Sequence, residues 1–492
     1  MARHDVDLIV LGGGAAGLTA SGIAASFGAK TMMVERHRLG GDCTWTGCVP
    51  SKTLLQSAHA AHVIRHAGRY GLIDQEPQID FSRMMAQLHA IRDEVYHDAD
   101  RPAIYEAMGV DVRFGAARFT DPHTVEIEGE DGTVRVTGRY VVVATGARAF
   151  VPPIDGLDAV PHLTNETLFE LTEQPGHLAI VGGGPIGTEM AQAFRRLGSR
   201  VTVIDLAGRI LGNDDAELAE RLQGVLEDEG VAYVLGAGVQ RVARQNGHLT
   251  VFAEQDGQTR TVEADALLMA TGRRANVDAL GLEAAGVAHS KKGIDVDDRC
   301  RTSQRHIYAV GDVTGRYQFT HMSEHMAKVA VTNAILKLPS KIDAGHVPWV
   351  TYADPELAHV GARARDLDER GAAYRTYRFP YTKVDRAVTE RETTGLIKVF
   401  AKPLTGTILG ATVLGARAGE LIGEFAVAMR HGVSLRKLSD TIHPYPTYGL
   451  GARRAADQWY AQKQSPTLVR VLQTVFGYRG QVPPEPDPDR IV

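Results

Sequence analysis

Cysteine is scarce in this chain: only three occur among its 492 residues, Cys43, Cys48 and Cys300. Three cysteines cannot build the disulfide framework of a small secreted protein, nor a cysteine-rich zinc domain. A chain that depends so little on disulfides is typical of a reducing compartment, so we expect a cytoplasmic protein.

The chain also lacks an excess of charge of one sign. Lysine and arginine total 54 and aspartate and glutamate total 59, which gives a formal net charge of −5. The composition therefore gives no electrostatic reason to expect a nucleic-acid partner. At roughly 100–200 residues per domain, the length corresponds to about three domains and argues against a lone peptide-binding module.

Long hydrophobic runs are missing except at residues 8–29, which carry no charged side chain and are long enough for a membrane span. Six glycines interrupt this run, and the five residues before it are barely basic. A strand, a turn and a buried helix explain the run better than a leader or a span. We therefore expect neither secretion nor a transmembrane segment.

Glycine, in contrast, is abundant, with 52 residues of 492, above the usual ~7%. Residues 6–11 predict a buried strand, and Gly12-x-Gly14-x-x-Gly17 follows directly, before a predicted close-packed helix. The next predicted strand ends at Glu35, 23 positions after Gly12. A carboxylate at that place can accept hydrogen bonds from an adenosine ribose.

The same arrangement occurs a second time. Residues 178–181 predict a strand that leads into Gly182-x-Gly184-x-x-Gly187, and a later strand ends at Asp205, again 23 residues after the first glycine. Glycines at these places let backbone N–H groups approach a pyrophosphate at a helix N-terminus, whose partial positive charge favours an anion. Two such units predict two bound dinucleotides.

Both units end in the tripeptide Ala-Thr-Gly, whose glycines are Gly146 and Gly272. The tripeptide begins 132 residues after Gly12 in the first unit and 88 residues after Gly182 in the second. The first unit therefore carries 44 additional residues, and two of the three cysteines fall within it.

A different pattern begins at about residue 347. Residues 395–401 and 407–413 predict a β-hairpin with helices on either side and no glycine fingerprint, which indicates a separate α+β unit. Residues 465–480 predict a helix with one apolar face, for which packing on its own protein and docking to a protein partner or a membrane surface are the alternatives. Residues 481–492 contain four prolines and predict a disordered tail.

The two neighbouring cysteines, Cys43 and Cys48, precede a predicted helix with Pro50 in its first turn. A regular helix rises about 7.5 Å over five residues, more than the roughly 4.4–6.8 Å that a disulfide allows between Cα atoms. If the two cysteines pair, Cys43 must lie in a bent segment, which the adjacent glycines allow. A helix N-terminus beyond Cys48 would lower a thiol pKa. Two unpaired buried cysteines and a metal site are the alternatives, and Cys300 is interpreted as an ordinary loop thiol.

These motifs resemble those of the FAD-dependent pyridine nucleotide-disulfide oxidoreductases, among them lipoamide dehydrogenase, glutathione reductase and mercuric reductase. The resemblance runs from about residue 5 to 465. It rests on the two fingerprints, on residues 41–52, 270–276 and 308–312, and on residues 347–361, which resemble the start of the family's dimerisation domain.

The resemblance implies an α/β fold with two Rossmann-like dinucleotide-binding domains, for FAD and NAD(P), and a C-terminal α+β dimerisation domain. The implied division is an FAD-binding domain at 1–150 with the redox-active disulfide, an NAD(P)-binding domain at 151–275, a return segment of the FAD domain at 276–345, the dimerisation domain at 346–470 and a tail at 471–492.

The implied cofactors are FAD and NAD(P)H. The residues implied for FAD are Gly12, Gly14, Gly17, Glu35, Lys52, Gly146 and Asp312, and those for NAD(P)H are Gly182, Gly184, Gly187, Asp205 and Gly272. We expect NADH to be preferred, because Asp205 can hydrogen-bond a ribose 2′-hydroxyl but repels a 2′-phosphate. Arg209, four residues later, argues in the other direction, because its side chain could bind the 2′-phosphate of NADPH.

The implied catalytic residues are Cys43, Cys48, Lys52, Glu189 and Tyr445, and no metal ligands are implied. Cys48 would be the flavin-proximal thiol of the charge-transfer complex, and Cys43 the exposed interchange thiol that meets the substrate. Lys52 would pair with Glu189 beside flavin N5.

The chain departs from the family where a histidine of the partner subunit, oriented by a glutamate five residues later, faces the interchange thiol. One alignment puts Tyr445 at the histidine position and Leu450 at the glutamate position, whereas alignment on His443 puts Tyr448 at the latter. Neither alignment keeps a His–Glu pair. A tyrosine is similar to mercuric reductase, but that family's C-terminal cysteine pair is missing. Packing at the dimer interface is the alternative role for Tyr445.

The expected protein is a homodimeric enzyme in which NAD(P)H reduces the flavin, the flavin reduces the Cys43–Cys48 disulfide, and the dithiol reduces a disulfide, a metal ion or another small acceptor. A dihydrolipoamide dehydrogenase and a flavin reductase acting on quinone or metal are the alternatives among enzymes. The alternative from another class is a redox-sensing or partner-binding flavoprotein with little turnover.

Overall fold

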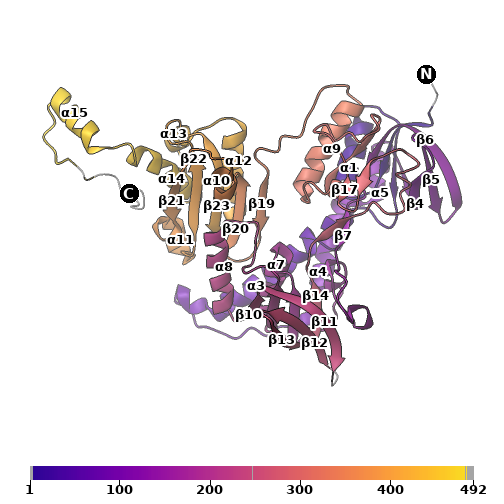
Figure 1. The fold of residues 1–492 in the computed structure, drawn as a ribbon, viewed down its shortest axis with the longest axis horizontal. Coiled ribbons are helices and arrows are strands. Elements are labelled where there is room, and N and C mark those ends of the chain that lie inside the picture. Colours follow the sequence, from indigo (N-terminus) through magenta and orange to yellow (C-terminus); the bar gives the residue numbers. More distant parts are fainter. Residues whose placement is uncertain (1–3, 246–247, 483, 485–492) are drawn as a thin grey trace.

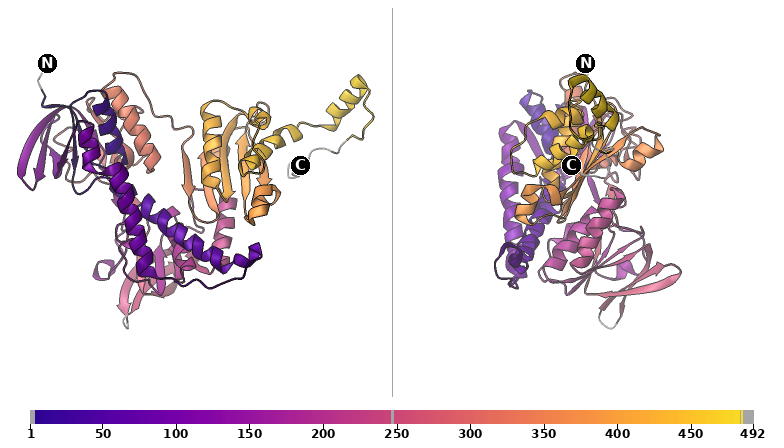
Figure 2. Two further views of the ribbon diagram at one scale, coloured as in Figure 1. Left: turned by 180° about the vertical axis from the view of Figure 1, so that it is seen from behind. Right: turned by 90° about the vertical axis from the view of Figure 1, so that its left-hand side faces the viewer.

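A computed structural model describes residues 4–245, 248–482 and 484 of the chain. Three lobes, each with a central sheet, are connected by extended segments, and a helix near the C-terminus projects away from them (Figure 1, Figure 2). We call them the first, second and third lobe in the order in which the chain enters them.

The first lobe contains a seven-stranded sheet with a parallel centre. The parallel strands are β3 (Val110–Phe114), β2 (Thr31–Glu35), β1 (Val6–Leu11), β6 (Gly132–Val143) and β18 (Ile307–Ala309), and the antiparallel β5 (Thr124–Gly129) and β4 (Ala116–Phe119) extend the sheet. Helices α1 (Ala15–Ser26) and α9 (Thr320–Ala334) pack side by side on it (Figure 1). Because β18 and α9 follow the second lobe in the chain, the chain returns to the first lobe.

The additional residues of the first unit form mainly helices. They are α2 (Gly41–Trp45), α3 (Cys48–Arg65), η1 (Ala67–Tyr70), α4 (Phe81–Val95), η2 (Tyr96–Asp100) and α5 (Pro102–Ala107). Asp80 caps α4 by accepting a hydrogen bond from the backbone N–H of Arg83 at 3.0 Å. The predicted helix after Cys48 is therefore confirmed, with Pro50 in its first turn.

The second lobe repeats the start of the first. Its parallel sheet has the order β10 (Val231–Leu235), β9 (Arg200–Asp205), β8 (His177–Val181), β14 (Ala266–Met269), and it is covered by α7 (Pro185–Arg196) and α8 (Ala216–Asp228). A three-stranded antiparallel sheet is added by β11 (Ala237–Gln245), β12 (His248–Gln255) and β13 (Gln258–Ala264). A Cβ atom on Gly17 would collide with the carbonyl oxygen of Gly12, and one on Gly187 with that of Gly182, so both turns need glycine for the same close approach.

A short antiparallel ribbon links the first two lobes. It pairs β7 (Ala147–Ala149) with β15 (Arg273–Ala275), so each strand directly follows one of the Ala-Thr-Gly tripeptides. The remaining short elements of these lobes are η3 (Leu157–Ala159), α6 (Asn165–Leu168), β16 (His289–Ser290), β17 (Gly293–Ile294) and η4 (Gly311–Thr314).

The third lobe is the predicted α+β unit. Its antiparallel sheet has the order β19 (Pro348–Thr351), β20 (Glu356–Gly361), β23 (Ile408–Gly415), β22 (Leu396–Ala401), β21 (Arg375–Pro380). Its helical elements are α10 (Ala364–Glu369), η5 (Tyr381–Lys383), α11 (Asp385–Glu390), α12 (Ala418–Arg430), α13 (Leu435–Asp440) and α14 (Gly449–Ala461). The buried β22–β23 pair confirms the predicted hairpin.

The third lobe meets the second lobe and helix α3 at Asp354, in the loop between β19 and β20. Its carboxylate is 2.7 Å from Nη1 of Arg196 on α7 and 3.1 Å from Nδ1 of His59 on α3. Arg196 also pairs with Glu229 at 2.6 Å, and only 6% of the Arg196 side chain is exposed. Burial alone would raise the pKa of Asp354, but hydrogen bonding to His59 and the charge of Arg196 hold it well below its usual range.

The last helix, α15 (Pro466–Phe476), extends away from the three lobes (Figure 1). Within the part of the chain that the structure describes, none of its side chains is buried. Packing on its own protein, one of the alternatives from the sequence, therefore does not occur within this single chain. The predicted domain boundary after residue 470 falls inside this helix, and most of the predicted tail at 481–492 lies outside the described residues.

Candidate redox site

Each of the two glycine fingerprints places a helix N-terminus at the end of a buried strand. Gly14 is the N-cap of α1, and Gly184 is the N-cap of α7. A Cβ atom on Gly184 would meet nothing within 4 Å, and one on Gly14 would meet only the Cα of Gly41, at 3.6 Å. The space in front of both N-termini is thus open, which fits the approach of a pyrophosphate to the backbone N–H groups.

The acidic residue of each unit is held against its glycine turn. Glu35 accepts hydrogen bonds from the backbone N–H groups of Gly13 at 2.7 Å and His37 at 2.8 Å. Asp205 accepts hydrogen bonds from the backbone N–H groups of Gly183 and Ala207, the latter at 2.7 Å. Each carboxylate therefore has a fixed position beside its turn.

The two tripeptide glycines lie where the ribbon leaves the sheets. Both adopt a positive φ, +68° at Gly146 and +116° at Gly272. Gly146 accepts a hydrogen bond from the backbone N–H of Asn276 at 3.0 Å, and Gly272 accepts one from that of Phe150 at 2.9 Å. The first tripeptide is thus hydrogen-bonded to the residue after β15, and the second tripeptide to the residue after β7. The two glycine units are therefore connected through corresponding positions.

The cysteine pair lies at the start of α3. Cys43 is in the short helix α2, a break at Thr46 and Gly47 follows, and Cys48 is the first residue of α3. This confirms that the segment is bent. All three cysteines are free in this structure, with Cys43 half-buried and Cys48 exposed. The expected exposure of Cys43 is thus only partial.

The environment favours a thiolate at Cys48. A hydrogen bond from Cys43, the hydroxyl of Thr320 at 3.5 Å and the charge of Lys52 lower the pKa of Cys48 to about 6, although burial opposes them. The same hydrogen bond, together with burial, raises the pKa of Cys43 well above its usual range. The reduced pair at neutral pH is therefore a Cys43 thiol that donates a hydrogen bond to a Cys48 thiolate.

Lys52 and Glu189 form an ion pair between helices α3 and α7, which come from the first and the second glycine unit of the sequence. Nζ of Lys52, one turn into α3, lies 2.8 Å from Oε2 of Glu189 on α7, whose side chain is 6% exposed. The other oxygen of Glu189 accepts a hydrogen bond from the backbone N–H of Tyr352 at 2.8 Å, and Lys52 lies 4.5 Å from the centre of the Tyr352 ring. The structure thus brings together the pair that the resemblance implied, and adds Tyr352, which no sequence motif indicated.

Asp312 lies directly after β18, in η4, and faces Arg273. Its Oδ2 is 3.4 Å from Nε of Arg273, whose guanidinium also pairs with Asp42, the neighbour of Cys43. Burial raises the pKa of Asp312, and the charge of Arg273 opposes that shift. Arg273 belongs to the quoted motif at 270–276, but its contact with the cysteine segment is apparent only in the fold.

In the segment after α13, Tyr445 and His443 have different surroundings. Tyr445 is 70% exposed, and a hydrogen bond to Asp385 raises its pKa. His443 is nearly buried, with Nε2 2.6 Å from Oε1 of Glu424 on α12 and Nδ1 2.9 Å from the carbonyl oxygen of Thr441. A His–Glu pair is nevertheless present outside both alignments, because α12 supplies a glutamate 19 residues before the histidine instead of five residues after it.

Two predicted side chains at other places are buried. Leu450, in the first turn of α14, is 8% exposed. Cys300 is a loop thiol, as expected, but it is wholly buried, and burial raises its pKa to about 12. Within the described ranges no cluster of three or more His, Cys, Asp or Glu side chains could hold a metal ion, and no helix is long and apolar enough to cross a membrane.

Comparison with known proteins identifies the family. The model for pyridine nucleotide-disulphide oxidoreductases matches residues 6–327, and the model for their dimerisation domain matches residues 347–455. This chain belongs to that family. The fold is accordingly α/β, with FAD- and NAD(P)-binding lobes followed by a dimerisation domain, and residues 347–455 support a homodimer.

Three relatives show how the family divides. A mercuric reductase of Lysinibacillus sphaericus is 35% identical over 92% of this chain and 82% of its own. A dihydrolipoyl dehydrogenase of Bacillus subtilis (strain 168) is 31% identical over 92% and 97%. The structure of a Cu(II) complex of the HOCl-induced flavoprotein disulfide reductase RclA from Escherichia coli has a TM-score of 0.83 and 28% identity over 93% and 99%. The family is FAD-dependent and uses NAD(P)H, and its members act on sulfur groups or metal ions.

The low pKa of Cys48 can be tested by alkylation of the reduced enzyme. We expect the rate of Cys48 modification by iodoacetamide, followed by peptide mass spectrometry, to rise with pH around a midpoint of about 6, because only the thiolate reacts. Cys43→Ala removes the hydrogen bond that contributes most and should move the midpoint upward, toward the ordinary ~8.5.

The buried Cys300 provides the control for this experiment. Cys300→Ala should leave the Cys48 midpoint unchanged, because the Cys300 thiol is buried and unreactive at neutral pH. A midpoint that stays near 6 in Cys43→Ala would contradict the assignment of the hydrogen bond.

Proposed function

We propose that this chain is an FAD-containing reductase that uses NAD(P)H, preferably NADH, and passes electrons through Cys43 and Cys48 to a disulfide, a metal ion or another small acceptor. One observation carries the proposal. Cys48 starts α3, which the first glycine unit of the sequence contributes, and Lys52, one turn later, is paired at 2.8 Å with Glu189 on α7 of the second unit. The proposed flavin and nicotinamide units therefore meet beside the thiol pair.

The glycine turns and their carboxylates are proposed to hold the cofactors. FAD would lie on Gly12, Gly14 and Gly17, with Glu35 at its ribose, Asp312 at its ribityl chain, and Gly146 and Lys52 nearby; the nicotinamide nucleotide would lie on Gly182, Gly184 and Gly187, with Asp205 and Gly272. Bound FAD would supply a ring that accepts hydride from NAD(P)H and donates an electron pair to a disulfide.

The cysteines are proposed to complete the transfer. Reducing the Cys43–Cys48 disulfide takes two electrons, and the pKa values of the pair leave one proton on Cys43 and none on Cys48 at neutral pH. Lys52, held by Glu189, contributes a positive charge that favours the Cys48 thiolate. Cys43 would pass its proton to the Cys48 thiolate and attack one sulfur of the acceptor disulfide, and the released thiolate would take up that proton. Cys48 would then attack Cys43, re-form the Cys43–Cys48 disulfide and release the second thiol of the acceptor. With a metal ion as acceptor, both sulfurs would bind it and supply two electrons as they form the disulfide.

The preference for NADH is supported by Asp205 and Arg209. A fixed carboxylate at Asp205 suits a ribose 2′-hydroxyl and repels a 2′-phosphate. Arg209, the phosphate partner considered from the sequence, donates instead to the backbone carbonyls of Ile210, Leu211, Gly212 and Asp214.

We expect kcat/KM for NADH to exceed that for NADPH by at least about tenfold, which corresponds to about 1.4 kcal/mol of transition-state stabilisation. Asp205→Ser should reduce the ratio of the two kcat/KM values, mainly by raising kcat/KM for NADPH. Arg209→Gln should not lower kcat/KM for NADPH more than that for NADH. A higher kcat/KM for NADPH in the unmodified enzyme would contradict the proposal.

Dihydrolipoamide dehydrogenase is the second candidate, and the His443–Glu424 pair is the observation in its favour. Both ring nitrogens of His443 are nevertheless engaged within its own chain, and the residue that the loop presents is Tyr445. A tyrosine whose pKa is raised is a poor base at neutral pH. We therefore propose that Tyr445 contacts the acceptor or the partner subunit and that lipoamide is a weak substrate.

Lipoamide turnover distinguishes the two candidates. A positioned histidine contributes typically ~10²–10⁴-fold to proton transfer, so Tyr445→His should raise lipoamide turnover at least about tenfold above a slow wild type. His443→Gln is the matched control and should change turnover little, with its thermal stability measured in parallel. A fast wild type, or one disabled by His443→Gln, would identify the chain as a lipoamide dehydrogenase. We leave Leu450 unchanged because a glutamate there would be buried.

The exposed helix α15 has an apolar face that a binding partner could cover. Its apolar side chains Leu468, Val471, Leu472, Val475 and Phe476 are 36–66% exposed. We propose that the partner subunit covers this face, because α15 continues the chain directly from the matched dimerisation domain. A membrane surface is less well suited, since helices that bind anionic lipid are rich in Lys and Arg and α15 has only Arg470. A low-turnover flavoprotein that binds a different protein is the remaining alternative.

Charge on the apolar face should weaken the dimer. The double variant Val471→Asp, Val475→Asp is expected to raise the dimer Kd at least about tenfold in sedimentation velocity, because two carboxylates would have to be desolvated. Thr467→Asp, outside the five apolar positions, is the control and should have little effect. An unchanged dimer Kd would contradict the proposal, and binding of the wild type alone to phosphatidylglycerol vesicles would reassign the face to lipid.

A further inference from the structure

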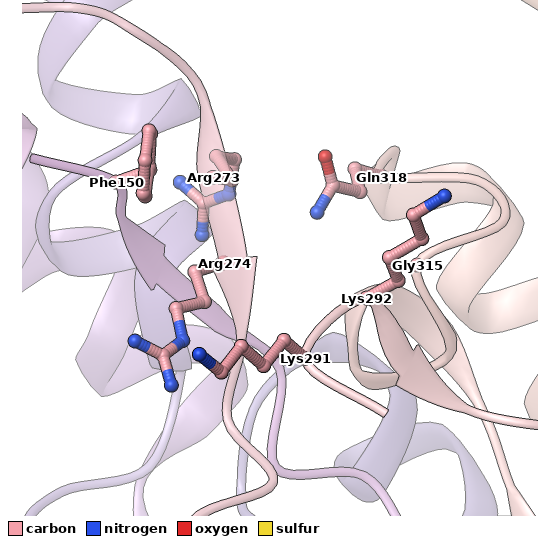
Figure 3. Close-up of a pocket in the computed structure, with 7 residues that line it drawn as sticks. All are labelled: Phe150, Arg273, Arg274, Lys291, Lys292, Gly315 and Gln318. Carbon is pink, nitrogen blue, oxygen red and sulfur yellow. The ribbon is translucent and has the colours of Figure 1, made fainter. Parts of the chain in front are cut away.

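A cavity of about 440 Å³ lies between the β7–β15 ribbon and the β16–β17 hairpin. Seven residues line it, namely Phe150, Arg273, Arg274, Lys291, Lys292, Gly315 and Gln318 (Figure 3). Its volume is within the range of small-molecule sites. None of the lining residues belongs to a glycine fingerprint, and the function proposed above gives the cavity no role.

The cavity is lined by four cationic side chains and no acidic one. Arg273 is paired with Asp42 and Asp312 on the side of the cysteines. Arg274 has weaker pairing: its Nη2 is 3.5 Å from Asp278, whose closer partner is Arg148 at 2.5 Å. The Nε atom of Arg274 is buried and has no hydrogen-bond partner among the described residues.

Lys291 and Lys292 add two charges on a turn whose backbone is well defined. They form the two-residue turn of the β16–β17 hairpin, in which the backbone N–H of Lys292 donates to Ser290 Oγ at 3.2 Å. The turn packs on Gly315, where a Cβ atom would collide with the carbonyl oxygen of Lys292. Both lysines are exposed, and within the described residues neither forms an ion pair. Adjacent like charges repel, and an anion between the turn and β15 would relieve that repulsion.

We propose that this cavity binds a small molecule through a multiply charged oxyanion group, a phosphate or a cluster of carboxylates. Arginine forks bind such groups in a bidentate manner, and lysines add point charges. Phe150 offers an apolar surface and Gln318 an amide for the remainder of the molecule. Figure 3 shows the arginines coming from β15 and the lysines from the facing hairpin, with Lys291 reaching toward Arg274 and the end of Lys292 pointing away from it.

The lining of the cavity is connected to residues that contact the redox cysteines. Gln318 is two residues before Thr320, whose hydroxyl lies 3.5 Å from Sγ of Cys48. Arg273 lines the cavity and also holds Asp42, next to Cys43. The site is separate from the proposed acceptor chemistry, so its test does not depend on turnover.

Calorimetric titration of the FAD-loaded enzyme tests the proposal directly. Pyrophosphate and citrate are the probes for phosphate and carboxylate chemistry, and saturating NAD⁺ is present so that the glycine turn of the second lobe is occupied. We expect at least one probe to bind, and the double variant Lys291→Gln, Lys292→Gln to bind it at least tenfold more weakly. Arg274→Gln should also weaken binding, and a rise in ionic strength should weaken it further.

The matched control removes the same charge elsewhere. Lys402→Gln, Lys437→Gln changes two exposed lysines of the third lobe and should leave the Kd within about twofold. The proposal is overturned if neither probe binds, if the control pair weakens binding as much as Lys291→Gln, Lys292→Gln, or if NAD⁺ abolishes binding, which would assign the anion to the nucleotide site. If pyrophosphate binds and citrate does not, the cavity selects phosphate groups. If both bind, the cavity selects small molecules with several negative charges, whether phosphate or carboxylate.

Discussion

The Asp354 carboxylate, whose side chain is 29% exposed, connects the third lobe to α7 of the second lobe and to α3, and the geometry of the candidate site depends on it. Arg196 of α7 and His59 of α3 both contact this carboxylate, and Tyr352, two residues earlier, holds Glu189. A buried ion pair is weak evidence for net stability, but removal of one partner typically costs about 3–5 kcal/mol because a charge is left buried. Asp354 therefore fixes α3 against α7, and this fixes Lys52 against Glu189.

Sequence patterns predicted the features that depend on local chemistry. Gly17 and Gly187 must be glycine because a carbonyl oxygen occupies the place of a side chain, so the two fingerprints and the strands before them could be found in the sequence. The two apolar runs on either side of the turn at residues 403–406 predicted the β22–β23 hairpin, which is also a local feature. A bend between Cys43 and Cys48 was expected from helix geometry on the condition that the two cysteines pair, and the structure has a break there.

Contacts between segments far apart in the sequence could not be predicted from such patterns. Tyr352 reaches Glu189 across 163 residues and Thr320 reaches Cys48 across 272, and no periodicity records either contact. Glu424 was missed because the family pattern places the glutamate after the histidine, whereas here it comes from the preceding helix. The exposed face of α15 has the same apolar spacing as a helix packed in a core, so its surroundings could not be predicted.

Helix α3 is, in mechanical terms, a strut anchored at both ends. Its 18 residues span about 27 Å. Lys52 is tied to α7 near the thiols, and at the far end Arg65 donates to the carbonyl of Arg196 while Arg69, just beyond the helix, pairs with Glu392 of the third lobe at 2.9 Å. Such a strut cannot pivot when the sulfurs bond or separate. The displacement must be taken up in the short segment before Cys48, where Gly40 and Gly41 have φ values of +98° and +59°.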